Sequence, residues 1–293
     1  MSKLITVGQL LDETWDRYTK HFKTFMHIAC WLFAVSAIWI FGAMLVPADD
    51  ASFAASQGLL TPLEQVGMFI TGFSSTLLYA IVTVWVFIVL VLTLNRMDKK
   101  MPVSLRELNR ETGKKFFPYS LVIFLRSLIF LLPVLTIVPG FGLILLNVQL
   151  HGGTALGALS LLFTFLGIVA AIVLLIILGV FLAFPGYELL VGKKKIIESI
   201  HGSYTLVKGR FWATLWRLFI PKALITIATI FTEIILFTIF ILLLSASPGL
   251  SDVLISRLSD VVGNLALTGI TILVTPLFVL ADYLVYESLK GSR

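Results

Sequence analysis

Residues 156–185 read LGALSLLFTFLGIVAAIVLLIILGVFLAFP, a stretch without one charged side chain. A helix of about 20 apolar residues crosses the hydrocarbon core of a bilayer, so this run is long enough to span a membrane. Other long apolar runs precede and follow it, and only short segments separate them. We predict an all-α polytopic membrane protein with six transmembrane helices, over residues 24–46, 67–94, 116–138, 156–185, 218–246 and 262–286.

The overall composition agrees with this prediction. The 293 residues are 58% apolar and 13% charged, and their mean hydropathy is +1.02. Soluble proteins carry about 25% charged residues, so a soluble fold is excluded. The connecting segments are far shorter than a typical globular domain. We expect one membrane domain over residues 1–293, with no appended soluble enzyme.

The positive charges predict the topology. Of the 22 lysines and arginines, 19 fall in the two termini and in the segments after the second and fourth spans. The opposite segments hold one, Arg257, and the other two, Arg126 and Lys222, lie inside spans. Short basic segments stay in the cytoplasm, so we expect both termini on the cytoplasmic side of the plasma membrane. The net charge of +6 is then a topology signal and not a nucleic-acid surface.

Amphipathic helices are predicted at the cytoplasmic interface over residues 3–20, 104–113 and 194–207. In the first, one helix face carries Val7, Leu10, Leu11, Thr14, Trp15 and Tyr18. Thr6 with Gln9 forms a capping-box pattern at its start. Basic and aromatic side chains follow each helix, where they could contact anionic lipid head groups. These candidate interfacial residues are Lys20, Lys23, Lys114, Lys115, Lys208, Arg210 and Trp212.

The three interfacial segments have a regular spacing. Thr19, Thr112 and Thr205 lie 93 residues apart, and the first and third segments match best. An internal repeat would place three similar units around an axis along the membrane normal. The alternative is that any cytoplasmic entry to a span carries basic and then aromatic residues, because both prefer the interface.

Two stretches carry a resemblance to a known family. They are Phe184-Pro185-Gly186-Tyr187-Glu188 and the run from Ser203 to Trp212, which reads SYTLVKGRFW. Together with Thr275-Pro276 and a tyrosine at the exit of the last span, they resemble the membrane domain named after membrane-anchored glycerophosphodiester phosphodiesterases. The resemblance implies a six-span membrane domain. The separate catalytic barrel of the founding enzymes is absent here, so it implies no phosphodiesterase activity.

The third span has an unusual end. Pro133 and the sequence Pro139-Gly140-Phe141-Gly142 interrupt an apolar stretch that reaches residue 146. Proline followed by glycines predicts that the helix ends near Val138. Residues 143–146 would then lie at the outer interface or form a short re-entrant segment, and we favour the interface.

No sequence motif supports catalysis or a metal site. The four histidines lie in different segments, and neither a nucleophile elbow nor a phosphate-binding loop is present. Charges inside the spans are the remaining candidates for function. Charged residues at similar depth in the membrane are expected to pair. This predicts a pair between Arg126 and Glu233, and a pair of Lys222 with Asp282 or Glu188. These residues either hold spans together as ion pairs or line a site for an anionic head group or solute.

We therefore predict a non-enzymatic integral membrane protein that interacts with lipids or acts as a scaffold or anchor. The expected partners are membrane lipids with anionic head groups, and no cofactor, metal or nucleic acid is expected. The alternative is a transporter or lipid translocator that uses the intramembrane charges.

Overall fold

The computed structural model describes residues 4–46, 61–150, 153–245 and 252–291. Within these residues the chain is helical and contains no strand, which confirms the predicted all-α class. Six helical stretches are long and apolar enough to cross a membrane: Phe22–Met44, Pro62–Asp98, Leu105–Gln149, Thr154–Leu190, Phe211–Leu244 and Arg257–Gly291. Each contains most or all of one predicted span. The protein is a polytopic membrane protein.

The chain divides into two compact units, described separately below. The bundle unit contains residues 3–112 and 217–287, and the hairpin unit contains residues 113–216 with the C-terminal segment from residue 288.

The bundle unit begins with α1 (Val7–Lys20), α2 (Phe22–Ala29) and α3 (Trp31–Met44). Next come α5 (Pro62–Phe73), one turn of π-helix, η1 (Ser74–Leu78), and α6 (Tyr79–Asp98). The first turns of α7 (Leu105–Leu131), most of α12 (Phe211–Ser245) and most of α13 (Asp252–Gly291) complete it. Its core is a run of buried aliphatic residues in the second half of α6 and the aliphatic and tyrosine side chains of α13 between residues 279 and 286.

The N-terminal helix begins as predicted. The Thr6 hydroxyl accepts a hydrogen bond from the Gln9 N–H at 3.3 Å, and the Thr6 N–H donates to the Gln9 side chain at 3.2 Å. Of the predicted apolar face, Leu10, Thr14 and Tyr18 are buried and Val7 and Leu11 are half-buried, but Trp15 is 58% exposed. Tyr18 also donates a hydrogen bond to the Leu273 carbonyl at 3.0 Å, so α1 is attached to α13.

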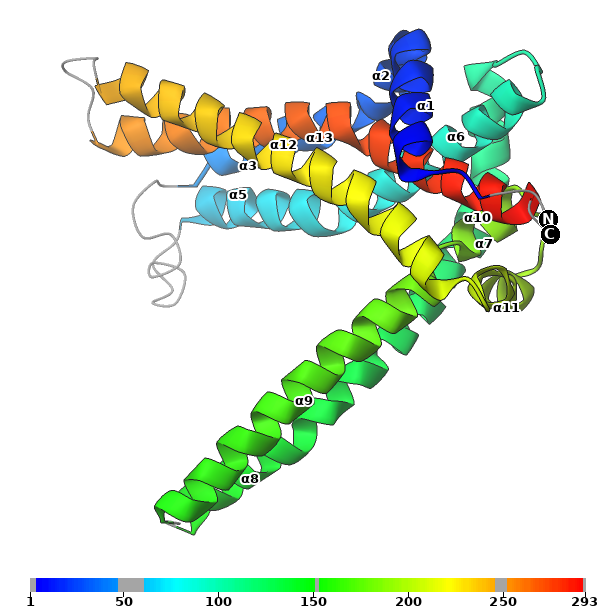
Figure 1. Ribbon diagram of the computed structural model, residues 1–293. Helices are drawn as coiled ribbons and strands as arrows, with labels where there is room; N and C mark the ends of the chain where they lie inside the picture. Colours follow the sequence, from blue (N-terminus) through cyan, green and yellow to red (C-terminus); the bar gives the residue numbers. More distant parts are fainter. Residues whose placement is uncertain (1–3, 47–60, 151–152, 246–251, 292–293) are drawn as a thin grey trace. The chain divides into compact units, whose positions relative to one another are not determined.

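The hairpin unit is built on a pair of antiparallel helices. After α7 come η2 (Leu132–Ile137), α8 (Val138–Gln149) and α9 (Thr154–Phe181), and α8 lies alongside α9 (Figure 1). Two short helices follow, α10 (Pro185–Leu190) and α11 (Ile196–Val207), and then the first turns of α12.

The predicted end of the third span near Val138 is wrong. A 3-10 turn carries the chain past Pro133, and α8 then continues to Gln149, packed against α9. Residues 143–146 are therefore helical and belong to α8, and their location at the outer interface stays a prediction. Pro139 lies in the first turn of α8, where its missing N–H has no helical partner to lose. Gly140 then allows α8 to approach Thr164 of α9 closely.

The segment at 104–113 is not a separate helix. It forms the first turns of α7, which runs without a break through Pro118 to Leu131. The other two segments correspond to α1 and α11, and each ends in a break before the following helix. At the second break Gly209 has a φ of +82°, a conformation that favours glycine.

Candidate functional site

A buried ion pair organises the connection between α10 and α11 in the hairpin unit. The Glu188 side chain is almost fully buried, and its Oε2 lies 2.6 Å from Nζ of Lys194. Two glycines leave room for the pair. A Cβ at Gly192 would lie 2.6 Å from the Glu188 carbonyl, and one at Gly202 would lie 2.6 Å from the Lys194 Nζ. Glu188 therefore pairs with Lys194, a partner that its depth in the sequence did not predict.

The two stretches quoted for the family resemblance lie close together. The Ser203 hydroxyl donates to the Phe181 carbonyl at 2.6 Å and accepts from the Phe184 N–H at 3.0 Å. The Phe181 ring lies 5.0 Å from the Tyr204 ring and 5.5 Å from the Phe211 ring, measured between centroids. These contacts attach α11 and the start of α12 to the end of α9.

A basic groove lies beside this pair. It has a volume of about 840 Å³ and is lined by Lys115, Pro118, Leu189 and the run Lys193–Glu198. Lys115 donates to the Leu190 carbonyl at 3.1 Å and Lys194 is held by Glu188, while Lys193 and Lys195 are exposed. The groove thus combines positive side chains with the apolar surface of α11.

The other candidate interfacial residues are placed as follows. In the hairpin unit, Lys114 is exposed, Trp212 is 69% exposed, and Lys208 lies over the Tyr204 ring at 5.8 Å. Arg210 ends the break before α12, where its carbonyl accepts from the Thr214 N–H at 2.9 Å. In the bundle unit, exposed Lys20 ends α1 and exposed Lys23 lies in the first turn of α2. Of the seven candidate interfacial residues, Lys115 lines the basic groove and the other six do not.

Ion pairs join the helix ends in the bundle unit. Arg17 of α1 contacts Glu13 at 2.5 Å and Asp98 of α6 at 2.7 Å. Burial lowers the pKa of the Arg17 guanidinium, but Asp98 and Glu13 raise it by more, so it lies above its ordinary value. Arg96 of α6 contacts Glu107 and Glu111 of α7 at 2.9 and 3.3 Å. These contacts tie α1 and α7 to the same end of α6.

The predicted pair of Lys222 and Asp282 is present. Their Nζ and Oδ1 atoms lie 2.8 Å apart, between α12 and α13. Arg126 lies in the hairpin unit, 5.2 Å from the Phe130 ring centroid, and Glu233 lies in the bundle unit. A pair between Arg126 and Glu233 stays a prediction.

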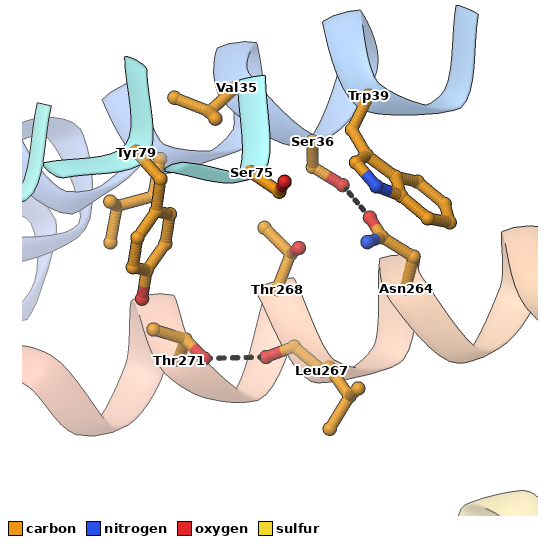
Figure 2. Close-up of a pocket in the computed structure, with 10 residues that line it drawn as sticks. Val35, Ser36, Trp39, Ser75, Tyr79, Asn264, Leu267, Thr268 and Thr271 are labelled. Carbon is orange, nitrogen blue, oxygen red and sulfur yellow. Dashed lines mark hydrogen bonds between the residues drawn. The ribbon is translucent and has the colours of Figure 1, made fainter. Parts of the chain in front are cut away.

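A polar cavity lies between α3, the η1–α6 junction and α13 in the bundle unit (Figure 2). We call it the serine–asparagine cavity; its volume is about 250 Å³. The Ser36 hydroxyl donates to the Asn264 side-chain oxygen across it. Figure 2 shows Ser75 and Thr268 between these residues and Tyr79. The π-helical turn places Ser75 on the cavity wall, and such turns are frequent at functional sites.

Two further cavities lie between α12 and α13. The glutamate cavity, about 180 Å³, is lined by Glu233 together with Thr226, Thr229, Thr271 and Thr275 and with apolar residues. The apolar cavity, about 420 Å³, is lined by Glu233 and by aliphatic and phenylalanine side chains. Thr271 also lines the serine–asparagine cavity, and Glu233 lines both of the others. The three spaces are therefore neighbours along α13.

Sequence reasoning missed these cavities. It considered only the charged residues within the spans and did not single out the polar uncharged ones. The available signal was the recurrence of threonine at helical spacing beside those charges, which predicts a polar face on each helix.

Comparison with known proteins gives no family assignment: no protein family, no curated protein and no solved structure matches this chain.

Proposed function

We propose that this protein is a non-enzymatic integral membrane protein that binds anionic lipid head groups at one membrane interface. The basic groove between α7, α10 and α11 carries the proposal. Its four lysines, Lys115 and Lys193–Lys195, lie beside Leu189, Ile196 and Ile197. A head group with one or two negative charges would contact the lysines, and its acyl chains would contact the apolar wall.

Exposed apolar side chains near the lysines support an interfacial location. Ile197 of α11 is 77% exposed and Phe117 of α7 is 75% exposed. Together with Trp212, they are the kind of side chain that inserts into the boundary between head groups and acyl chains. Each lysine near an anionic surface contributes about 1 kcal/mol to binding. Exposed Lys193 and Lys195 are best placed to contribute, because Lys194 already neutralises Glu188.

The distribution of lysine and arginine supports an orientation. The groove belongs to the segments that carry the positive excess, so we propose that it faces the cytoplasm, with both termini on that side of the plasma membrane. Membership of the glycerophosphodiester phosphodiesterase membrane-domain family is part of the same proposal. A scaffolding or anchoring role would follow from a lipid-bound interfacial surface.

Native mass spectrometry of the purified protein tests the proposal. We expect phosphatidylglycerol or cardiolipin adducts on the wild type and a loss of most of them in Lys193→Gln/Lys195→Gln. The matched control is Lys99→Gln/Lys100→Gln, which removes two exposed lysines that line no described cavity. Equal adduct populations in both double variants, or none on the wild type, would contradict lipid binding in the groove.

A further inference from the structure

A row of polar side chains runs along α12 at helical spacing. The α12 row falls at positions i, i+4, i+7 and i+11, which share one face of a helix. Its members are Lys222, Thr226, Thr229 and Glu233.

A second row with the same spacing runs along α13. The α13 row occupies positions i, i+4, i+7 and i+11, and a further member lies 18 residues, or five turns, after the first. Figure 2 shows that its first three members point from α13 into the serine–asparagine cavity or along its wall. Its members are Asn264, Thr268, Thr271, Thr275 and Asp282.

The α12 row faces the last three members of the α13 row, Thr271, Thr275 and Asp282, whereas Asn264 and Thr268 line the serine–asparagine cavity. The Lys222–Asp282 pair closes one end at 2.8 Å. One cavity then brings two threonines of α12 and Glu233 together with Thr271 and Thr275 of α13. The Thr229 and Thr271 hydroxyls donate to carbonyls one turn earlier on their own helices, at 2.8 and 2.7 Å, which leaves lone pairs on their oxygens for a ligand.

Glu233 is the centre of this arrangement. Among the described residues that line its two cavities it is the one ionisable side chain, and it forms no ion pair or hydrogen bond within the described part of the chain. The Lys222 charge is already balanced by Asp282. A carboxylate within a span is costly without a balancing positive charge.

We propose that the glutamate cavity binds one monovalent alkali cation of the sodium type. Glu233 supplies the single negative charge, and the four threonine hydroxyls supply the neutral oxygens that a hard cation prefers. The volume of about 180 Å³ has room for roughly six water-sized occupants, so the cation keeps part of its hydration. One carboxylate favours a monovalent over a divalent ion, because affinity for divalent ions depends on the number of charged ligands.

The neighbouring cavity gives the cation a polar path. The serine–asparagine cavity shares Thr271 with the glutamate cavity and adds the oxygens of Ser36, Ser75 and Asn264. Hydroxyl and amide groups thus continue from Glu233 to Ser36 in the middle of α3. The proposal goes beyond lipid binding at the basic groove and is independent of it, since the two sites share no residue.

Binding of ²²Na⁺ to the purified protein in detergent, at constant ionic strength with choline as the replacement ion, tests the site. We expect saturable binding of one Na⁺ per chain and a Tm that rises with Na⁺ concentration. Glu233→Gln should abolish both effects. Thr271→Val should weaken Na⁺ affinity at least tenfold while the protein stays folded.

The matched control is Asp260→Asn, which removes an exposed carboxylate of α13 that lines no described cavity. It should bind Na⁺ as the wild type does. Absence of ²²Na⁺ binding to the wild type overturns the proposal, as does binding that survives Glu233→Gln. A Tm that does not change with Na⁺ concentration also overturns it.

Discussion

Gly140 should not tolerate a methyl group, whereas Gly142, two residues later in α8, should tolerate one. A Cβ at Gly140 would lie 2.5 Å from both the Cα and the N of Thr164 on α9, but a Cβ at Gly142 meets nothing within 4 Å. Carbon atoms in contact are normally about 3.5–4.0 Å apart. Gly140→Ala therefore has to move α8 away from α9 by about 1 Å.

The expected change in unfolding free energy is the sum of two opposing effects. Replacing glycine by alanine inside a helix stabilises it by about 1 kcal/mol. Overpacking a tight contact costs about 1–3 kcal/mol. Gly142→Ala should be more stable than the wild type by up to about 1 kcal/mol, and Gly140→Ala should range from equal to about 2 kcal/mol less stable. The helix-propensity gain cancels when the two variants are compared, which leaves a difference of about 1–3 kcal/mol.

Reversible unfolding in mixed detergent–SDS micelles, followed by tryptophan fluorescence, measures this difference. Both variants add the same atoms to the same helix, so effects on micelle binding and on the unfolded chain are matched. Equal unfolding free energies for the two variants would refute the close approach of α8 to Thr164. Gly140→Ala being the more stable would refute it as well.

Two further predictions concern polar contacts. Lys194→Met leaves the buried Glu188 carboxylate without its partner and should lower the unfolding free energy by about 3 kcal/mol, the lower end for a broken buried pair because Lys194 is partly exposed. The control Lys193→Met should change the unfolding free energy by less than about 0.5 kcal/mol. Similar losses in both variants would contradict the ion pair. A double-mutant cycle of Ser36→Ala and Asn264→Ala should give a coupling of about 0.6 kcal/mol in unfolding free energy, as is usual for hydrogen bonds between membrane helices; strictly additive losses would show that the hydrogen bond is absent.

The positions of the helices were predictable because the signal is local. Apolar length and the capping box at Thr6 depend on a few neighbouring residues, and the structure confirms both. Depth in a span can be counted from its end, and this count left Asp282 and Glu188 as partners for Lys222; the structure shows Asp282. Opposite charges at matching depth in neighbouring helices then have a strong reason to pair.

The remaining features depend on contacts between distant parts of the chain. Pro139 and Gly140 predict a helix end in isolation, but packing of α8 on α9 makes continuation favourable. Glu188 pairs with Lys194 because a short loop turns back at Gly192, which no count of depth could show. The cavities depend on the facing of α12 and α13 and on a π-helical turn that no sequence pattern specified.

The length of α9 has a consequence for the membrane around the protein. Its 28 residues rise about 42 Å, against a hydrocarbon core of about 30 Å. The helix carries no charged residue along this length, so neither end is anchored by its own charge. Hydrophobic matching is then reached by a tilt of the helix or by local thickening of the bilayer. Lipid chain length therefore becomes a variable that acts on this protein: longer chains let α9 stand upright, and shorter chains force it to lean.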